Sequence, residues 1–306
     1  MGCTKEDAKS DVVPGLRIVQ EGMGGNGSKV WVSNTDKTQN GWVPYSYFSL
    51  EKVRLRNSRT DTKMDILKTD GGNFYINYTS AGTGNFSACY PSAMYNGSST
   101  STQVVLQNSA SILNYPQDGD YAGKLIVQFP MVAFGADGTT QLKFMHVTGA
   151  LAFDLVNNTG SNLVFNGSYG GVYDIEVTAK DNLDNPVKLW STSTNANFTC
   201  IPYGNGGINV TNNSLSTGIN YNRFYLMKGC TASAGSCIYE MAKNEIIHIV
   251  LPIPATAGTK FEITVYKASK PQENYVRGTK IKSRTTPLMT IERNTIYNLG
   301  PFYLAD

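Results

Sequence analysis

Histidines come first among the residues that could do chemistry, because an imidazole exchanges a proton near neutral pH and also binds metals. The chain contains two, His146 and His248, and both fall in strand-like runs. A catalytic histidine needs a nucleophile or an acid partner in a recognisable setting, and neither run supplies one. We interpret both as structural residues of a sheet, and we expect no catalytic residue and no metal site.

Most sequence motifs typical of enzymes and cofactor sites do not occur, and the one that does is followed by the wrong kind of secondary structure. GMGGNG, residues 22–27, matches GxGxxG, but the strand-like SKVWVSN follows it, whereas a dinucleotide site needs a helix there. GxSxG, HExxH and the GxxxxGK phosphate loop do not occur. The 23 Asp and Glu residues include no pair that stands out for glycoside hydrolysis. The sequence therefore predicts a protein that is not an enzyme and uses no cofactor.

The chain has five cysteines and no CxxC pair, so a structural zinc site is not expected. Cys230 and Cys237 bracket TASAGS, a short loop that could close as a local disulfide in an oxidising compartment. Cys89 and Cys200 are interpreted as buried small hydrophobic residues. Cys3 stands ahead of a short polar, charged segment, which is typical of a mature bacterial lipoprotein.

Lipid attachment at Cys3 is the membrane contact that we expect. A eukaryotic myristoylation signal would have Ser or Thr at position 6, where Glu6 stands. Residues 1–14 would form the lipoprotein tail. The alternative is a chance cysteine in a disordered tail. No run approaches the ~18 apolar residues that a membrane-spanning helix needs. We therefore expect the chain to meet a membrane only through a lipid on Cys3.

Composition favours β structure and gives no reason to expect nucleic acid as a partner. Charged residues make up 16% of the chain, and the formal net charge is only +3. The basic segments 52–59 and 277–284 lack the interleaved aromatic residues of a nucleic-acid surface, so we interpret them as solvated strands or loops. The three tryptophans Trp31, Trp42 and Trp190 could stack on sugars, but we interpret them as core residues.

Short runs rich in β-branched and aromatic residues predict strands, among them residues 124–129, 245–253, 260–268 and 289–300. Phe261, Ile263 and Val265 alternate with more polar residues, as expected when one face of a sheet meets a core.

Helix is expected at most over residues 60–69. A chain of 306 residues holds roughly two cores, so we expect an all-β protein of two antiparallel β-sandwich domains, residues 1–184 and 185–306.

Residues 143–157, KFMHVTGALAFDLVN, read as one long strand with a period of two. One face would carry Met145, Val147, Leu151, Phe153 and Leu155. His146 would then lie on the other, less apolar face, together with Thr148, Ala150, Ala152 and Asp154.

Five segments, taken in order, resemble fimbrillin-like proteins of Bacteroides-type bacteria. They contain an aromatic-Tyr-Pro segment, an F-x-H-x-x-x-A-L-x-F strand and a final Asn-x-x-Tyr-x-Leu strand, and they cover residues 85–94, 129–134, 142–157, 249–254 and 291–302. The resemblance implies an exported lipoprotein of two transthyretin-like β-sandwiches that serves as a subunit of a surface pilus, at the outer membrane. Cys3 matches the lipid-bearing cysteine of that family.

The resemblance also implies assembly by strand exchange. An Arg-specific protease would remove an N-terminal segment that includes the first strand, and a strand of another pilin subunit would fill the groove. Arg54, Arg56 and Arg59 are the candidate cleavage sites, so the removable segment would extend to about residue 59. Residues 15–22 are the candidate strand, and residues 29–34 are a rival.

The expected function is that of a structural or adhesive pilus subunit. The tail after NTIYNLG is only PFYLAD, which is short for a donor arm and favours a tip or accessory position over the stalk. Such a subunit would adhere to a ligand on a host or bacterial surface. The alternative function is a surface lipoprotein that binds glycans through exposed Trp and Tyr for nutrient capture.

Overall fold

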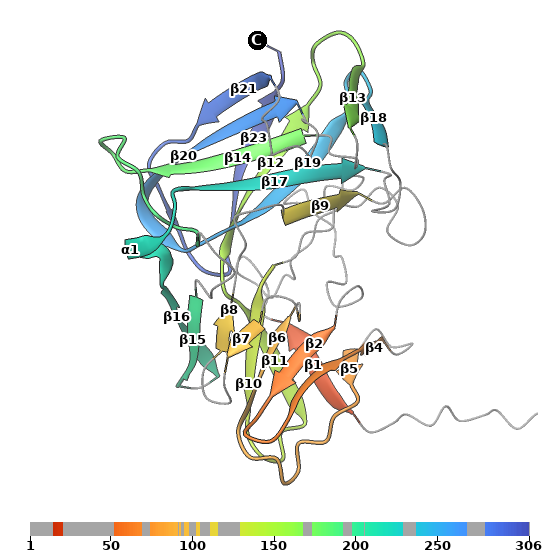
Figure 1. Cartoon of the computed structure of the whole chain (residues 1–306), viewed down its shortest axis with the longest axis vertical. Helices are drawn as coiled ribbons and strands as arrows, with labels where there is room; N and C mark the ends of the chain where they lie inside the picture. The colour runs from red at the N-terminus through yellow and green to blue at the C-terminus, as the bar shows by residue number, and fades with distance from the viewer. Residues whose placement is uncertain are drawn as a thin grey trace, which may run out of the picture.

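The computed structural model describes residues 15–20, 52–68, 74–90, 92, 95–97, 102–104, 111–115, 129–167, 173–191, 198–204, 206–228, 237–267 and 279–305. These residues form 23 strands and one short helix, α1 (Ser214–Thr217). The fold is all-β, as the composition predicted. Figure 1 shows the strands in two groups, one in the lower half of the view and one in the upper half.

The lower group contains an eight-stranded sheet of order β3-β2-β6-β10-β11-β1-β5-β4. Its strands are β1 (Leu16–Gln20), β2 (Val53–Arg56), β3 (Asp61–Met64), β4 (Ile66–Lys68), β5 (Phe74–Ile76), β6 (Phe86–Tyr90), β10 (Met131–Gly135) and β11 (Gln141–His146). β3 and β4 lie at opposite ends of this order, yet only Asp65 separates them in the chain. Since one residue spans less than about 7 Å, the sheet must curl until its two ends meet.

A second, four-stranded sheet in the lower group has the order β16-β15-β8-β7. It consists of β7 (Tyr95–Gly97), β8 (Thr102–Val104), β15 (Phe198–Tyr203) and β16 (Gly207–Asn212). β8 packs against β6 of the larger sheet. All five residues of β6 are buried, so both faces of that strand are covered.

The main sheet of the upper group has six strands. Five of them have the order β21-β20-β14-β17-β9, and the sixth, β22, pairs with β20. Its strands are β9 (Ser111–Tyr115), β14 (Tyr173–Lys180), β17 (Tyr221–Lys228), β20 (Thr256–Lys267), β21 (Lys280–Thr285) and β22 (Met289–Ile291). Phe261, Ile263 and Val265 of β20 have no exposed surface, which confirms the predicted apolar face.

Two smaller sheets complete the upper group. One has the order β19-β12-β23, from β12 (Gly149–Val156), β19 (Ile246–Ile253) and β23 (Ile296–Tyr303). The other pairs β13 (Leu163–Gly167) with β18 (Cys237–Met241). β12 is central and its first five residues are all buried, so it is enclosed on both faces.

The prediction of one long strand over residues 143–157 is wrong. β11 ends at His146, β12 begins at Gly149, and the two strands belong to different sheets. His146 is fully buried and its ring meets the ring of Phe129 edge-on, with centroids 6.1 Å apart. The expected less apolar face is therefore not exposed, because other elements cover both sides of this segment. The helix allowed over residues 60–69 is also absent, since β3 and β4 occupy those positions.

A turn before β23 holds the junction between β11 and β12. The Nη1 atom of Arg293 donates a hydrogen bond to the carbonyl oxygen of His146 at 2.9 Å, and the amide of Asn294 donates to that of Thr148 at 3.0 Å. Gly149 lies so close that an added Cβ would sit 2.4 Å from the carbonyl oxygen of Glu292. Only glycine fits there without displacing the turn.

Strands from before residue 184, the predicted domain boundary, pair with strands from after it. β14, which precedes it, pairs with β17 and β20, which follow it. β15 follows residue 184 but pairs with β8, far upstream. The chain therefore passes from the lower group to the upper group more than once.

Candidate strand-exchange site

β1 occupies an interior position in the eight-stranded sheet. It pairs in parallel with β11, from Arg17 opposite Gln141 to Gln20 opposite Phe144, and antiparallel with β5 on its other side. This strand matches the segment 15–22 that the sequence singled out.

The side chains of β1 alternate as a half-buried strand requires. Leu16 and Ile18 are each 2% exposed and belong to the core, whereas Arg17 between them is exposed. Gly15 leads into the strand, and an added Cβ there would lie 2.6 Å from the carbonyl oxygen of Ile76. Loss of β1 would uncover one edge of β11, one edge of β5 and the two pockets that Leu16 and Ile18 fill, which is the arrangement that accepts an added strand.

The three candidate arginines differ in their accessibility. Arg54 and Arg56 lie in β2, which is hydrogen-bonded to β3 on one side and β6 on the other. Arg54 is also held by Asp61, with Nε donating to Oδ1 and Nη2 to Oδ2, each at 2.8 Å. The hydrogen-bonded guanidinium holds the pKa of Asp61 below its usual value. Arg59 lies in the turn between β2 and β3, and it is exposed.

Asn57 fixes that turn. Its Oδ1 atom accepts hydrogen bonds from the amide of Arg59 at 2.8 Å and from the amide of Thr60 at 2.6 Å. Its Nδ2 atom donates to the hydroxyl of Tyr78 at 3.3 Å. The Arg59 side chain is thus presented from a short, anchored turn.

A cut after Arg59 would separate β2 as well as β1 from the rest of the chain. Val53 and Leu55 of β2 are fully buried, so this second strand contributes to the core. Residues 52–59 were interpreted as a solvated strand or loop, which is wrong for these two side chains. The alternation of Val53 and Leu55 with Arg54 and Arg56 was the signal that could have revealed a buried face.

Several predicted residues lie outside the described part of the chain. These are Cys3, Trp31, Trp42, Cys230 and the rival strand at residues 29–34. Cys237 begins β18, and its disulfide with Cys230 stays a prediction. Trp190 has no exposed surface, so it is a core residue and does not offer a surface for sugar stacking.

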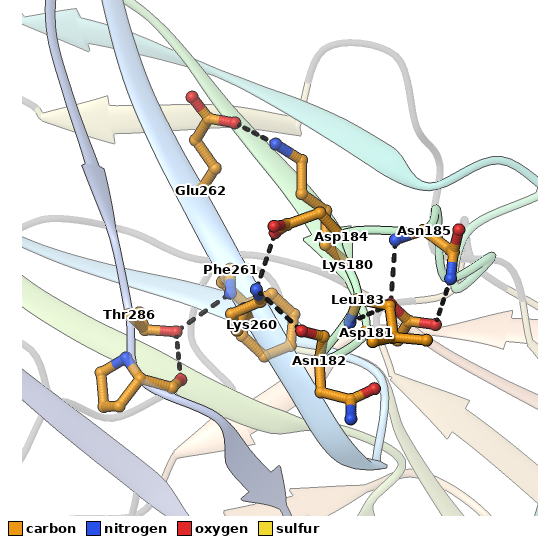
Figure 2. Close-up of polar contacts among 11 residues, drawn as sticks. Lys180, Asp181, Asn182, Leu183, Asp184, Asn185, Lys260, Phe261, Glu262 and Thr286 are labelled. Carbon is orange, nitrogen blue, oxygen red and sulfur yellow. Dashed lines mark hydrogen bonds and ion pairs between the residues drawn. The ribbon is translucent and has the colours of Figure 1, made fainter.

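Charged residues near the end of β14 form local pairs, which Figure 2 shows. The Nζ atom of Lys180 donates to Oε2 of Glu262 at 2.7 Å, and that of Lys260 donates to Oδ1 of Asp184 at 2.7 Å. The hydrogen bond from Lys180 lowers the pKa of Glu262 and raises the pKa of Lys180 itself. Both pairs link β14 and its following turn to β20, and we assign them a structural role.

Asp181 organises the turn that follows β14. Its Oδ1 atom accepts from the amides of Leu183 and Asn185 at 2.8 and 2.9 Å, and its Oδ2 atom accepts from Nδ2 of Asn185 (Figure 2). The Asn185 side chain thereby lowers the pKa of Asp181.

Within the described ranges, no three His, Cys, Asp or Glu residues are grouped so that they could hold a metal ion. None of the described residues belongs to a helix long and apolar enough to cross a membrane.

Comparison with known proteins finds similarity only among solved structures. No family model matches the chain, and no curated protein matches it. A candidate cell adhesion protein from Bacteroides ovatus is 11% identical, with a TM-score of 0.36 and coverage of 94% of this chain and 91% of that one. A fimbrial protein from the same species is 12% identical, with a TM-score of 0.30 and coverage of 96% and 50%.

The fimbrial anchor protein Mfa2 from Porphyromonas gingivalis is also similar. It is 11% identical, with a TM-score of 0.25 and coverage of 88% of this chain and 81% of that one. These three solved structures are thus a candidate cell adhesion protein, a fimbrial protein and a fimbrial anchor protein.

Proposed function

We propose that this chain is a structural or adhesive subunit of a bacterial surface pilus, assembled by strand exchange after export as a lipoprotein with its anchor at Cys3. One observation carries the proposal: β1 is an interior strand with two buried apolar side chains, and it is the first strand of the described chain. It can therefore leave the sheet without interrupting the connection between any other two strands.

Arg59 is the processing site that we propose among the three candidates. Proteases cut exposed turns more readily than paired strands, and Arg59 lies in an exposed turn while Arg54 and Arg56 lie inside a sheet. Cleavage there would release β1 and β2 together. The gaps would lie between β11 and β5 and between β3 and β6.

We further propose two sandwich domains divided at residues 147–148 rather than near residue 184. Every described strand up to β11 except β9 belongs to the lower group, and every later one except β15 and β16 belongs to the upper group.

A tip or accessory position is favoured over the stalk because β23 is already paired with β12, so it does not serve as a donor arm in this state.

Limited digestion with an Arg-specific protease tests the proposed function. We expect a new N-terminus at Thr60, measured by intact mass, followed by higher oligomers in size-exclusion chromatography with light scattering. Arg59→Lys should block both events. Arg54→Lys, the matched control in β2, should leave both intact. A trimmed protein that stays folded and monomeric would count against strand exchange.

A further inference from the structure

Strand register places the side chain of Cys89 on the outer face of the eight-stranded sheet. Cys89 of β6 stands opposite Arg54 of β2 and Val132 of β10. Residues that stand opposite one another in a sheet share a face. The Arg54 side chain is 29% exposed, so that face points away from the sheet's own interior. Cys89 is nevertheless fully buried, so another layer must cover it.

The four-stranded sheet provides that layer. β8 packs against β6, and β15 is hydrogen-bonded to β8, with Cys200 opposite Thr102. Cys200, Phe198 and Thr102 are buried, whereas Ile201 and Tyr203 on the other side of β15 are exposed. Cys200 therefore points inward, to the side on which β6 lies.

The electrostatics of the Cys89 thiol include a contribution from Cys200. Burial raises the pKa of the Cys89 thiol well above its usual value, and a thiolate at Cys200 would raise it further. Burial likewise raises the pKa of Cys200, to about 12. This influence of Cys200 on Cys89 agrees with the placement of both thiols between β6 and the four-stranded sheet.

We propose that Cys89 and Cys200 form a disulfide bond that links the two sheets when the chain folds in an oxidising compartment. Neither residue is in a disulfide bond in the structure. The bond forms by exchange with a disulfide donor, either an oxidised low-molecular-weight thiol or a thiol oxidoreductase. The two cysteine thiols lose two hydrogens and are oxidised, and the donor disulfide is reduced to two thiols.

The timing of this reaction follows from the burial of both groups. A thiolate is the reacting species, and a buried thiol with a raised pKa yields very little of it. The bond is therefore expected to form during folding, before the four-stranded sheet closes over β6. Mature protein in reduced form should react slowly with the same donor.

Peptide mapping tests the proposal. The full chain is denatured and reduced, then refolded in a mixture of reduced and oxidised glutathione, alkylated and digested with trypsin without reductant. Trypsin leaves Cys89 in the peptide 69–124 and Cys200 in the peptide 189–223. We expect these two peptides to be joined and to separate on reduction. Recovery of both as separate alkylated peptides from folded protein would overturn the proposal.

Two variants serve as controls. Cys200→Ala should abolish the joined peptide and leave Cys89 alkylated only after denaturation. The double variant Cys230→Ser with Cys237→Ser should keep the joined peptide, since it removes only the separate local pair. The bond closes a long loop, so in the Cys230→Ser, Cys237→Ser background reduction should lower the Tm of the oxidised chain by about 5–10 °C. Reduction should leave the Tm unchanged once Cys200→Ala is added to that background. A joined peptide without a change in Tm would contradict the linking role.

Discussion

At the scale of single residues, close approach at Gly149 makes the junction between β11 and β12 sensitive to one methyl group. An added Cβ would meet the carbonyl oxygen of Glu292 at 2.4 Å and Cγ2 of Ile291 at 2.6 Å. We expect Gly149→Ala to destabilise the protein by about 2 kcal/mol, because the turn must move. Urea unfolding measures this cost. Gly82→Ala, where the Cβ meets nothing within 4 Å but φ is +73°, should cost only about 1 kcal/mol through backbone strain.

A second prediction at this scale concerns acid stability. The folded pKa of Glu262 is lowered, chiefly by Lys180, below its usual value of 4.5. A lowered folded pKa stabilises the protein above the usual pKa, and that contribution is lost as the pH falls through the folded value. The Tm should therefore fall as the pH drops below 4.5. Glu262→Gln should show a shallower fall as the pH drops below 4.5, with Asp61 responsible for part of what remains. Equal slopes in the two proteins would refute this assignment.

At the scale of elements, β1 is held by the burial of two side chains and by hydrogen bonds on both edges. Ile18→Ala should destabilise the strand by about 2–4 kcal/mol, because it leaves a cavity in the core. Hydrogen–deuterium exchange should then accelerate at Gln141–Phe144, the segment of β11 that pairs with β1. Arg17→Ala, on the exposed side of the same strand, should leave exchange in β11 unchanged. An equal effect from both variants would show that burial does not hold β1.

Elements with a strict alternation were predictable from the sequence, and those enclosed on both faces were not. β20 shows one apolar face, so its strand and its buried residues could be read directly. Residues 144–153 are buried on both sides, and a change of sheet at residues 147–148 leaves no mark on a pattern with a period of two. At the candidate site, β1 and the arginines were identified. β2 pairs with β3 in a local hairpin, whereas its pairing with β6 is a long-range contact that no local pattern encodes.

At the scale of the whole molecule, the proposed division at residues 147–148 makes the two groups of strands separately testable. Leu151 lies in the upper group and Leu55 in the lower, and both are fully buried. A buried unpaired charge costs several kcal/mol, so Leu151→Asp should unfold the upper group and Leu55→Asp the lower. Calorimetry should show two transitions in the unaltered chain and the loss of a different one in each variant. Loss of all cooperative unfolding in both variants would argue for a single folding unit.

The parallel pairing of β1 with β11 has a consequence for the direction of growth of a fibre. A strand that replaces β1 with the same hydrogen bonds must run parallel to β11 and antiparallel to β5. Under the proposed exchange, every acceptor would therefore orient its donor in one sense only. Where such head-to-tail contacts do not close into a ring, they give a filament whose two ends differ. The polarity of the assembled fibre would then be set inside the folded monomer, by the direction of one five-residue strand.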